Sequence, residues 1–338
     1  MTPPPSDGLG WSRFFAEQLT PADAGLVPVR IAAVHRSRLM AETGTGQVRI
    51  VPPAHATTMD FAVGDWVLME PGGHTALRRL ARRTLLRRRT EGAQGRQLIV
   101  ANVDTMFVVT SCNEDFNVAR LERYLALVNE AGITPVIILT KIDQVEDAGV
   151  YVHQAEALQR DLPVVALNAK APNAADRLAP WCGPGQTAAL VGSSGVGKST
   201  LLNTLADKAP ADAQLTGGIR EGDARGRHTT TSRSLHAIAG GACVIDTPGM
   251  RTLHVSDAGA GLDMLFAEIT ELAPNCRFRD CTHAHEPGCA VQAAVTAGDL
   301  SAERLGRWRK LSTENSANTP VQYGPRGNKT PDPRGRRL

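Results

Sequence analysis

The chain has 338 residues, 42% hydrophobic and 21% charged, with a net charge of +3. This composition excludes a disordered chain, and the length predicts two or three domains of ~150 residues. No apolar run reaches the ~20 residues of a membrane span, and the Pro-rich start lacks the basic and apolar regions of a secretory signal. We therefore expect a cytoplasmic protein with no membrane contact.

The first two segments are predicted to be a flexible arm (1–25) and a small β-barrel domain (26–96). Trp11, Phe14 and Phe15 are candidate anchors for the arm. Short β-branched segments separated by glycine turns predict strands at 29–34, 47–51 and 65–70. An OB-fold that binds RNA is the favoured barrel, although strands alone do not distinguish it from an SH3-like barrel.

Residues 97–252 are predicted to form an α/β domain with a mostly parallel sheet. Apolar strand-like runs occur at 105–110, 135–139, 164–167, 187–191 and 243–245. Between the first two runs, Val118, Leu121, Leu125 and Val128 are spaced as on one face of a helix. Strands that alternate with helices are typical of a parallel sheet covered on both faces.

Residues 253–315 are predicted to be a mainly helical, metal-binding domain, followed by a disordered basic tail (316–338). The pattern Cys276-x₄-Cys281-x-His283-x₅-Cys289 offers three thiolates and an imidazole within fourteen residues. Four such ligands with no open position suit one structural, tetrahedral Zn²⁺. His285 is a spare donor that could replace His283. The separate cysteines Cys112, Cys182 and Cys243 are expected in the core.

A phosphate-binding loop follows the predicted strand 187–191. Gly192-Ser-Ser-Gly-Val-Gly-Lys-Ser199 matches G-x-x-x-x-G-K-[ST] in full, and a helix is expected from Thr200. Backbone N–H groups of such a loop surround the β-phosphate, Lys198 reaches the β- and γ-phosphates, and the Ser199 hydroxyl coordinates Mg²⁺. The nucleotide-contacting residues are Gly192, Ser193, Ser194, Gly195, Val196, Gly197, Lys198, Ser199 and Thr200.

A second phosphate-site motif is Asp246-Thr-Pro-Gly249, which follows the predicted strand 243–245. An aspartate at the end of a strand can reach Mg²⁺ through water, and Gly249 is assigned to the nucleotide site. D-x-P-G alone is a weak turn signal. Paired with the phosphate-binding loop, it indicates a nucleotide-hydrolysing site.

Two fragments indicate guanine as the base. Thr140-Lys141-Ile142-Asp143 resembles the [NT]-K-x-D motif of GTPases, in which the carboxylate accepts hydrogen bonds from the guanine N1–H and amine. Adenine would leave this carboxylate unpaired. Asn168-Ala169-Lys170 resembles the S-A-K loop that contacts the guanine oxygen. T-K-x-D alone could also be an exposed loop.

The order of the motifs departs from that of ordinary GTPases. Here the base motifs (140–143 and 168–170) precede the phosphate-binding loop (192–199), which precedes D-T-P-G. This order predicts a circularly permuted GTPase domain, which is feasible where the natural termini lie close together.

Arginine-rich clusters indicate contact with RNA phosphates. The clusters are Arg78, Arg79, Arg82, Arg83, Arg87, Arg88, Arg89 and Arg96 in the barrel region, and Arg304, Arg307, Arg309 and Lys310 near the C-terminus. A run of charge is usually a solvated face, but arginine dominance favours phosphate contact. Because aromatic residues are only 4% of the chain, we expect recognition of folded RNA by shape.

The permuted order, the preceding barrel and the following Cys/His cluster together resemble the bacterial ribosome small-subunit-dependent GTPase A (RsgA) family, over about residues 25–315. The resemblance implies a ribosome-stimulated GTPase that binds GTP, GDP and the 16S rRNA of a late, maturing small subunit, and that leaves after hydrolysis. It also favours His283 over His285 as the zinc ligand. We expect a monomer.

The segment Gly226-Arg-His-Thr-Thr-Thr231 looks like the family's G-x-H-T-T-T switch. By analogy Thr230, rather than Thr229 or Thr231, is expected to complete the Mg²⁺ site. Met250 stands where many GTPases have a water-orienting glutamine, so His228 is the candidate catalytic residue. A non-catalytic role for His228, in which it contacts RNA or simply packs, is equally supported. The alternative function is an RNA-binding module whose GTPase core no longer hydrolyses, against which Lys198, Ser199 and Asp246 argue.

Overall fold

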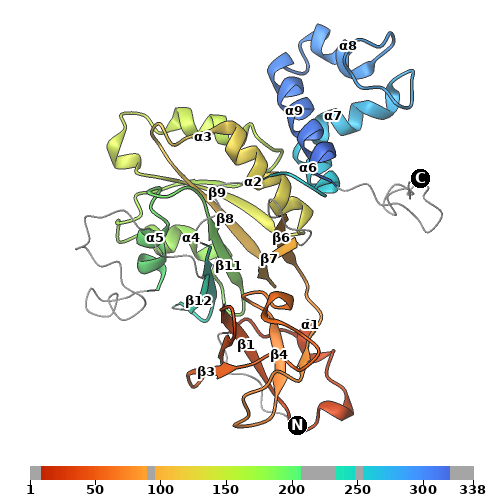
Figure 1. The fold of residues 1–338 in the computed structure, drawn as a ribbon. Coiled ribbons are helices and arrows are strands. Elements are labelled where there is room, and N and C mark those ends of the chain that lie inside the picture. Colours follow the sequence, from red (N-terminus) through yellow and green to blue (C-terminus); the bar gives the residue numbers. More distant parts are fainter. Residues whose placement is uncertain (1–8, 90–95, 207–232, 239, 248–253, 320–338) are drawn as a thin grey trace, which may run out of the picture.

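The computed structural model describes residues 9–89, 96–206, 233–238, 240–247 and 254–319, and these form a chain of three units (Figure 1). A small β-unit lies at one end, an α/β unit in the middle, and a group of helices at the other end. Within these ranges, no helix has the length and apolar character needed to cross a membrane.

The first unit is a five-stranded antiparallel sheet with the order β3-β2-β1-β4-β5. Its strands are β1 (Val27–Val34), β2 (Leu39–Glu42), β3 (Gln47–Ile50), β4 (Trp66–Met69) and β5 (Arg78–Arg79). A parallel bridge between Val51 and Thr75 joins the two edges of the sheet. The sheet therefore closes on itself around a small apolar core that includes Ile31, Leu39 and Val67.

A two-stranded hairpin connects this unit to the next. It consists of β6 (Leu85–Arg89) and β7 (Arg96–Ala101), and Val100 forms a bridge with Val63 of the first unit. These two strands were not predicted from the sequence. The hairpin spans the predicted boundary between the barrel domain and the α/β domain at residue 96.

The central unit contains a six-stranded sheet with the order β10-β9-β8-β11-β13-β12. Its strands are β8 (Thr105–Ser111), β9 (Thr134–Thr140), β10 (Val164–Ala166), β11 (Thr187–Val191), β12 (Ser234–Ala237) and β13 (Cys243–Asp246). All neighbours pair in parallel except the edge strand β12, which is antiparallel to β13. The predicted parallel sheet is confirmed, with β12 as an addition.

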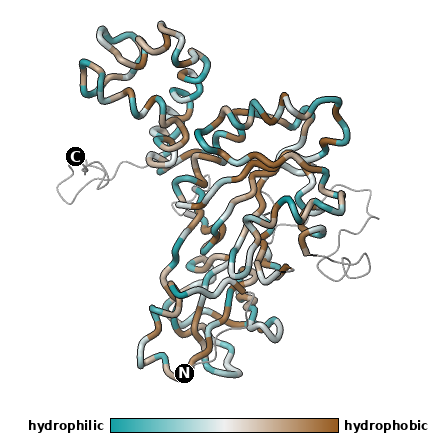
Figure 2. Tube along the Cα trace, turned by 180° about the vertical axis from the view of Figure 1, so that it is seen from behind, coloured by the Kyte–Doolittle hydropathy of each residue, from teal (hydrophilic) through white to brown (hydrophobic). Residues whose placement is uncertain are grey.

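Helices cover both faces of this sheet, which explains the continuous apolar strands (Figure 2). On one face, Ile137 and Leu139 pack with α2 (Val118–Glu130) and α3 (Gly149–Glu156). Val136 and Ile138 point to the opposite face, where the covering helices are α4 (Ala174–Leu178) and α5 (Lys198–Leu205).

The C-terminal unit is helical, as predicted, and is fastened to the central unit by buried ion pairs. Its helices are α6 (Gly259–Leu265), α7 (Ala267–Leu272), α8 (Ala290–Ala297) and α9 (Ala302–Asn318). On α9, Arg304 donates to Glu122 of α2 at 3.0 Å and to Glu268 at 2.7 Å, and Arg307 donates to Glu122 at 2.8 Å. Because Glu122 is only 1% exposed, these arginines neutralise a buried charge.

Several arginines expected at an RNA surface also form ion pairs within the protein. In addition to the pairs on α9, Arg78 binds Asp23 and Arg82 binds Asp65, each at 2.6 Å, and Arg83 pairs with Asp104. The acidic partners lie far away in the sequence, so the arginine runs could not be recognised as internal from their own composition. Arg304 and Arg82 are the least exposed of these side chains, at 8% and 13%, and are committed to their internal partners.

The segment before β1 is anchored from Leu9 onward instead of forming a loose arm. Phe15, in the short helix α1 (Arg13–Ala16), is 2% exposed. The Trp11 ring stands edge-on to Trp66 of β4, with ring centroids 4.8 Å apart. Of the three candidate anchors, Trp11 and Phe15 pack inward, whereas Phe14 is exposed.

One fully buried guanidinium, that of Arg30 on β1, joins this segment to the first unit and to the central unit. It donates to the carbonyls of Gly64 (3.3 Å), Asn102 (3.1 Å) and Leu9, and to Oγ1 of Thr187 (2.8 Å). Thr187 is the first residue of β11. Burial lowers the pKa of Arg30, while the nearby Cys243 and Asp65 oppose that shift.

Replacing Arg30 by methionine should destabilise the protein by about 3 kcal/mol or more, because each buried acceptor left without a donor costs ~1–3 kcal/mol. Urea unfolding followed by tryptophan fluorescence measures this loss. The matched control is Arg49→Met on the exposed side of β3, which should change stability by no more than ~0.5 kcal/mol. Equal unfolding midpoints for the two variants would contradict the assignment of Arg30 as a structural link.

Candidate functional site

The predicted phosphate-binding loop connects β11 to α5, the strand–loop–helix arrangement that its motif requires. Gly192 has a φ of +149°, and a Cβ there would lie 2.1 Å from the carbonyl oxygen of Val109. Gly197 has a φ of +94° and directly precedes α5. Two glycines of the motif are therefore required, one by close backbone approach and the other by its left-handed conformation.

Lys198, the first residue of α5, folds back over the loop. Its ammonium donates to the carbonyls of Gly192 at 2.9 Å and Ser193 at 2.5 Å. The positive charge is thus held above the loop at the N-terminus of a helix, where an anion is electrostatically favoured. Ser199 is exposed beside it.

The predicted base motif is tied to this loop by its threonine. Thr140, the last residue of β9, is 1% exposed, and its Oγ1 donates to the carbonyl of Val196 at 2.7 Å. The next residue, Lys141, has a left-handed backbone (φ +58°) and leads into a single turn that carries the exposed Asp143. Threonine at this position therefore has a structural role that the sequence motif did not reveal.

The second base fragment is tied to the helix that follows the loop. Thr204 of α5 donates through Oγ1 to the carbonyl of Ala169 at 2.7 Å. The fragment is also internally ordered, since the Asn168 side chain accepts from the backbone N–H of Lys170 at 2.9 Å. The structure thus brings 140–143, 168–170 and 192–200 together, although up to 60 residues separate them in the chain.

Asp246 ends β13, next to β11, and is the acidic group beside the phosphate-binding loop. Asp246 pairs in register with Leu190 of β11, which lies two residues before the loop. Burial raises the pKa of Asp246, and the positive charge of Lys198 opposes that rise. Its Oδ1 is buried and has no hydrogen-bond partner among the described residues. A buried oxygen without a donor fits a group that faces Mg²⁺ or its water ligands.

Other predicted site residues lie outside the described ranges. These are His228, Thr230, Gly249, the neighbouring Thr229 and Thr231, and Met250. The roles of these residues in catalysis and in nucleotide and Mg²⁺ binding stay predictions from the sequence.

The four predicted metal ligands converge between α7 and α8. The ligand atoms of Cys276, Cys281, His283 and Cys289 all lie within 4.8 Å of one another. The Sγ atoms of Cys276 and Cys289 are 3.8 Å apart, and His283 Nδ1 lies 3.5 and 3.4 Å from them. A tetrahedral zinc ion with Zn–S near 2.3 Å would separate two sulfurs by about 3.8 Å, so the spacing fits.

Neighbouring side chains hold His283, and not His285, at this cluster. Gln292 of α8 donates to the His283 carbonyl at 2.6 Å, and the Trp308 ring of α9 lies 5.4 Å from the imidazole. Arg309 of α9 also donates to that carbonyl. His285 is exposed. The spacing of the motif allowed either His283 or His285 as the fourth ligand. The packing around His283 selects it, and this packing could not be predicted from the sequence.

The lone cysteines lie where they were expected. Cys112 and Cys243 are buried in the core, and Cys182 is partly buried. Burial raises the pKa of the Cys182 thiol to about 11, so it is unreactive at neutral pH.

Comparison with known proteins places these features in one family. The family model for the RsgA GTPase matches residues 79–256. The small ribosomal subunit biogenesis GTPase RsgA of Mesorhizobium japonicum is 67% identical over 329 residues, which cover 97% of this chain and 95% of that protein. The small ribosomal subunit biogenesis GTPase RsgA 2 of Vibrio vulnificus is 47% identical over 314 residues, which cover 92% of this chain and 88% of that protein.

Solved structures support the fold. YjeQ from Thermotoga maritima matches with a TM-score of 0.61 and 25% identity, covering 86% of this chain and 98% of that one. YloQ, described as a circularly permuted GTPase, matches with a TM-score of 0.59 at 23% identity, covering 90% and 100%. With the family model matching over half of the chain and relatives aligned along nearly all of it, the chain belongs to the RsgA GTPase family.

Proposed function

We propose that this protein hydrolyses GTP to GDP and phosphate in the cytoplasm during late maturation of the small ribosomal subunit. The observation that carries the proposal is the tying of the base fragments to the phosphate-binding loop and to the helix that follows it, through Thr140 and Thr204. They lie beside Asp246, whose buried Oδ1 has no hydrogen-bond partner among the described residues. Relatives named for small ribosomal subunit biogenesis support the cellular role.

In this proposal the base is guanine and the metal at the phosphates is Mg²⁺. Asp143 accepts the guanine N1–H and amine, and the fragment 168–170 lies over the guanine oxygen. Lys198 and the loop N–H groups hold the β- and γ-phosphates. Ser199, Asp246 and Thr230 would hold Mg²⁺, whose charge favours the negative charge that builds up on the phosphates. His228 is the proposed residue for positioning water.

The flanking units are proposed to bind ribosomal RNA, and the protein is proposed to act as a monomer. The topology of the first unit, with β1 between β2 and β4 and a parallel closure near β3 and β5, supports an OB-type barrel. Its remaining exposed arginines, such as Arg36 and Arg49, are available for phosphate contact. The metal of the C-terminal unit is proposed to be one structural Zn²⁺.

Hydrolysis is tested by measuring GTP turnover with and without small ribosomal subunits. We expect slow turnover that subunits accelerate, and Lys198→Ala should lower the rate by about 10²–10³, as is typical when one preorganised donor at the reacting charge is lost. Arg177→Met on α4 is the matched loss of charge outside the site and should retain wild-type turnover. Wild-type protein without turnover in either condition would favour a non-hydrolysing RNA-binding module.

Guanine selectivity should depend on Asp143. Asp143→Asn presents an amide donor to the donors of guanine, so we expect GTP affinity to fall by about 10–100-fold, while xanthosine triphosphate gains affinity. Asp176→Asn, an exposed carboxylate on α4, serves as the control. Unchanged discrimination between the two nucleotides in a fluorescence competition assay would show that the base site lies elsewhere.

Zinc should be bound by the four clustered ligands and should stabilise the C-terminal unit. Cys281→Ala removes one thiolate, and structural zinc contributes on the order of 10 kcal/mol, so this variant should lose zinc and unfold locally. Elemental analysis and proteolysis measure both effects. Cys182→Ala, which changes a cysteine outside the cluster, should keep one zinc per chain. Full zinc content in Cys281→Ala would contradict the assignment.

A further inference from the structure

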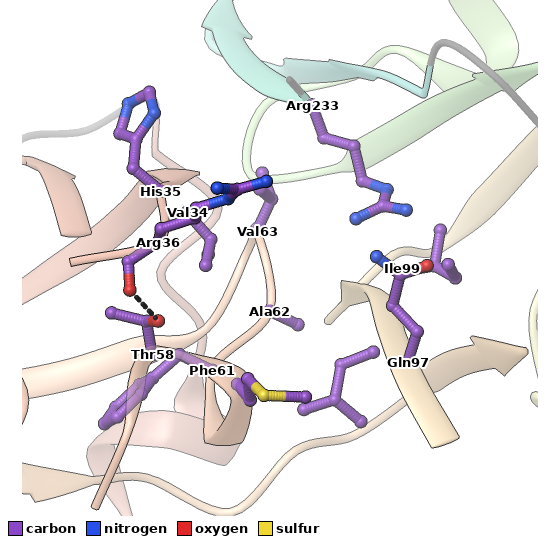
Figure 3. A pocket seen from close by; sticks show the side chains of 12 residues that line it. Val34, His35, Arg36, Thr58, Phe61, Ala62, Val63, Gln97, Ile99 and Arg233 are labelled. Carbon is purple, nitrogen blue, oxygen red and sulfur yellow. Dashed lines mark hydrogen bonds between the residues drawn. The ribbon is translucent and has the colours of Figure 1, made fainter. Parts of the chain in front are cut away.

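A pocket of about 230 Å³ lies where the first unit, the connecting hairpin and the central unit meet (Figure 3). Its walls come from the end of β1, the segment after Thr57, the strand β7 and Arg233, the residue before β12. It is separate from the phosphate-binding loop and from the Cys/His cluster. Sequence analysis did not single out any residue of this pocket.

Arg233 is the unusual member of the lining. Its Nε is buried and has no hydrogen-bond partner among the described residues, although a buried guanidinium nitrogen normally has one. Burial, with a contribution from the like charge of Arg88, lowers the pKa of Arg233 to about 10, so the side chain is still charged at neutral pH. A buried N–H on a charged group is costly to the folded protein when it has no acceptor, unless a ligand supplies one.

The polar groups around Arg233 are also donors. Figure 3 shows Arg36 and Arg233 extending into the pocket from opposite sides. The Gln97 side-chain oxygen accepts from Arg88 Nε at 2.9 Å, which leaves its amide N–H groups to donate. None of the residues that line the pocket is Asp or Glu, within the described part of the chain. The pocket therefore has the charge and donor set of an anion site.

The remaining lining is apolar and open at its rim. Phe61, Val63 and Ile99 form the floor, and Met59 is 77% exposed at the edge. The volume is below the ~300–1,000 Å³ of pockets that enclose drug-sized ligands. This size suits a phosphate and its sugar, with the adjoining units of a polymer continuing over the rim. Arg88 beside the pocket extends the positive charge beyond it.

We propose that this pocket is an RNA-phosphate site, in which Arg233 and Arg36 hold one phosphodiester of ribosomal RNA and the apolar floor contacts its sugar. The inference rests on the proposed function and adds a specific binding site to it. Arginine is suited to this role because its planar fork of donors matches two phosphate oxygens.

The location of the site connects RNA binding to the nucleotide site. Arg233 directly precedes Ser234, which pairs in register with Asp246 across β12 and β13. β12 in turn packs against β1 of the first unit. An RNA phosphate held by Arg233 is therefore one residue from the strand pair that positions the carboxylate proposed for the Mg²⁺ site.

The test compares full-length wild-type protein with Arg233→Met, Arg233→Lys and the control Arg177→Met. Binding of a short fluorescein-labelled single-stranded RNA is measured by anisotropy over a range of salt concentrations. We expect Arg233→Met to weaken binding by about tenfold and to reduce the log–log salt slope by about 0.7, the value for one phosphate contact to a single strand. Arg233→Lys should restore the slope, and Arg177→Met should match wild type.

Thermal unfolding separates a binding role from a structural one. Because Arg233 has an unsatisfied buried nitrogen, Arg233→Met should unfold at the same or a higher temperature than wild type. A lower unfolding temperature with unchanged RNA binding would overturn the proposal, as would an unchanged salt slope. AMP binding, measured without RNA, distinguishes a free nucleotide from RNA. Binding of AMP to wild type but not to Arg233→Met, with equal RNA binding by the two proteins, would assign the pocket to a free nucleotide and overturn the RNA assignment.

The proposed function is checked separately by subunit-stimulated GTP turnover of the wild-type protein. If the wild type is stimulated and Arg233→Met requires the same subunit concentration for half-maximal stimulation, only the pocket assignment fails. A wild-type protein that subunits do not stimulate would instead count against the proposed function. Both the pocket assignment and the proposed function are supported if subunits stimulate the wild type and Arg233→Met needs an approximately tenfold higher subunit concentration for half-maximal stimulation.

Discussion

The placement of the first unit against the central sheet depends on satisfying one buried positive charge, that of Arg30. Its guanidinium reaches carbonyls of three separate segments and the hydroxyl of Thr187, so the N-terminal segment, the barrel, the hairpin and β11 are held to one point. The space around it is filled, since a Cβ at Gly10 would lie 2.3 Å from Arg30 Nη1. β11 then leads directly into the phosphate-binding loop. The barrel is consequently fixed to the strand that carries the nucleotide chemistry.

The nucleotide site follows the same rule on a smaller scale, because single hydroxyl groups join segments that are distant in the chain. Thr140 and Thr204 each donate to a backbone carbonyl that no regular secondary structure satisfies. These bonds make the positions of the base fragments depend on the loop that holds the phosphates. The circular permutation leaves this geometry intact, since it changes the order of connections and not the neighbours in the sheet.

The sequence predicted the parts of the fold whose signals are local. The strands 105–110 and 187–191 were recognisable as continuous apolar runs, and the loop at 192–199 by its glycines and lysine. The hairpin β6–β7 was missed because Leu85–Arg89 is mostly charged, and β12 because an edge strand is short and polar. The ion pairs made by the arginine clusters were not predicted because some partners are remote: Glu122 precedes Arg304 by 182 residues. Tertiary partners of this kind leave no periodic signal.

Helix α9 contacts two different parts of the protein. Arg304 and Arg307 bind Glu122 of α2, while the next two residues, Trp308 and Arg309, contact His283 of the Cys/His cluster. A rigid helix that serves both contacts makes them thermodynamically linked. Whatever stabilises the cluster also favours the docked position of α9 on α2, and α2 covers the sheet that ends in the base motif. If a metal ion occupies this cluster, its release would also loosen the contact of α9 with α2, so the helical covering of the nucleotide-binding sheet would depend on a metal bound in a different unit.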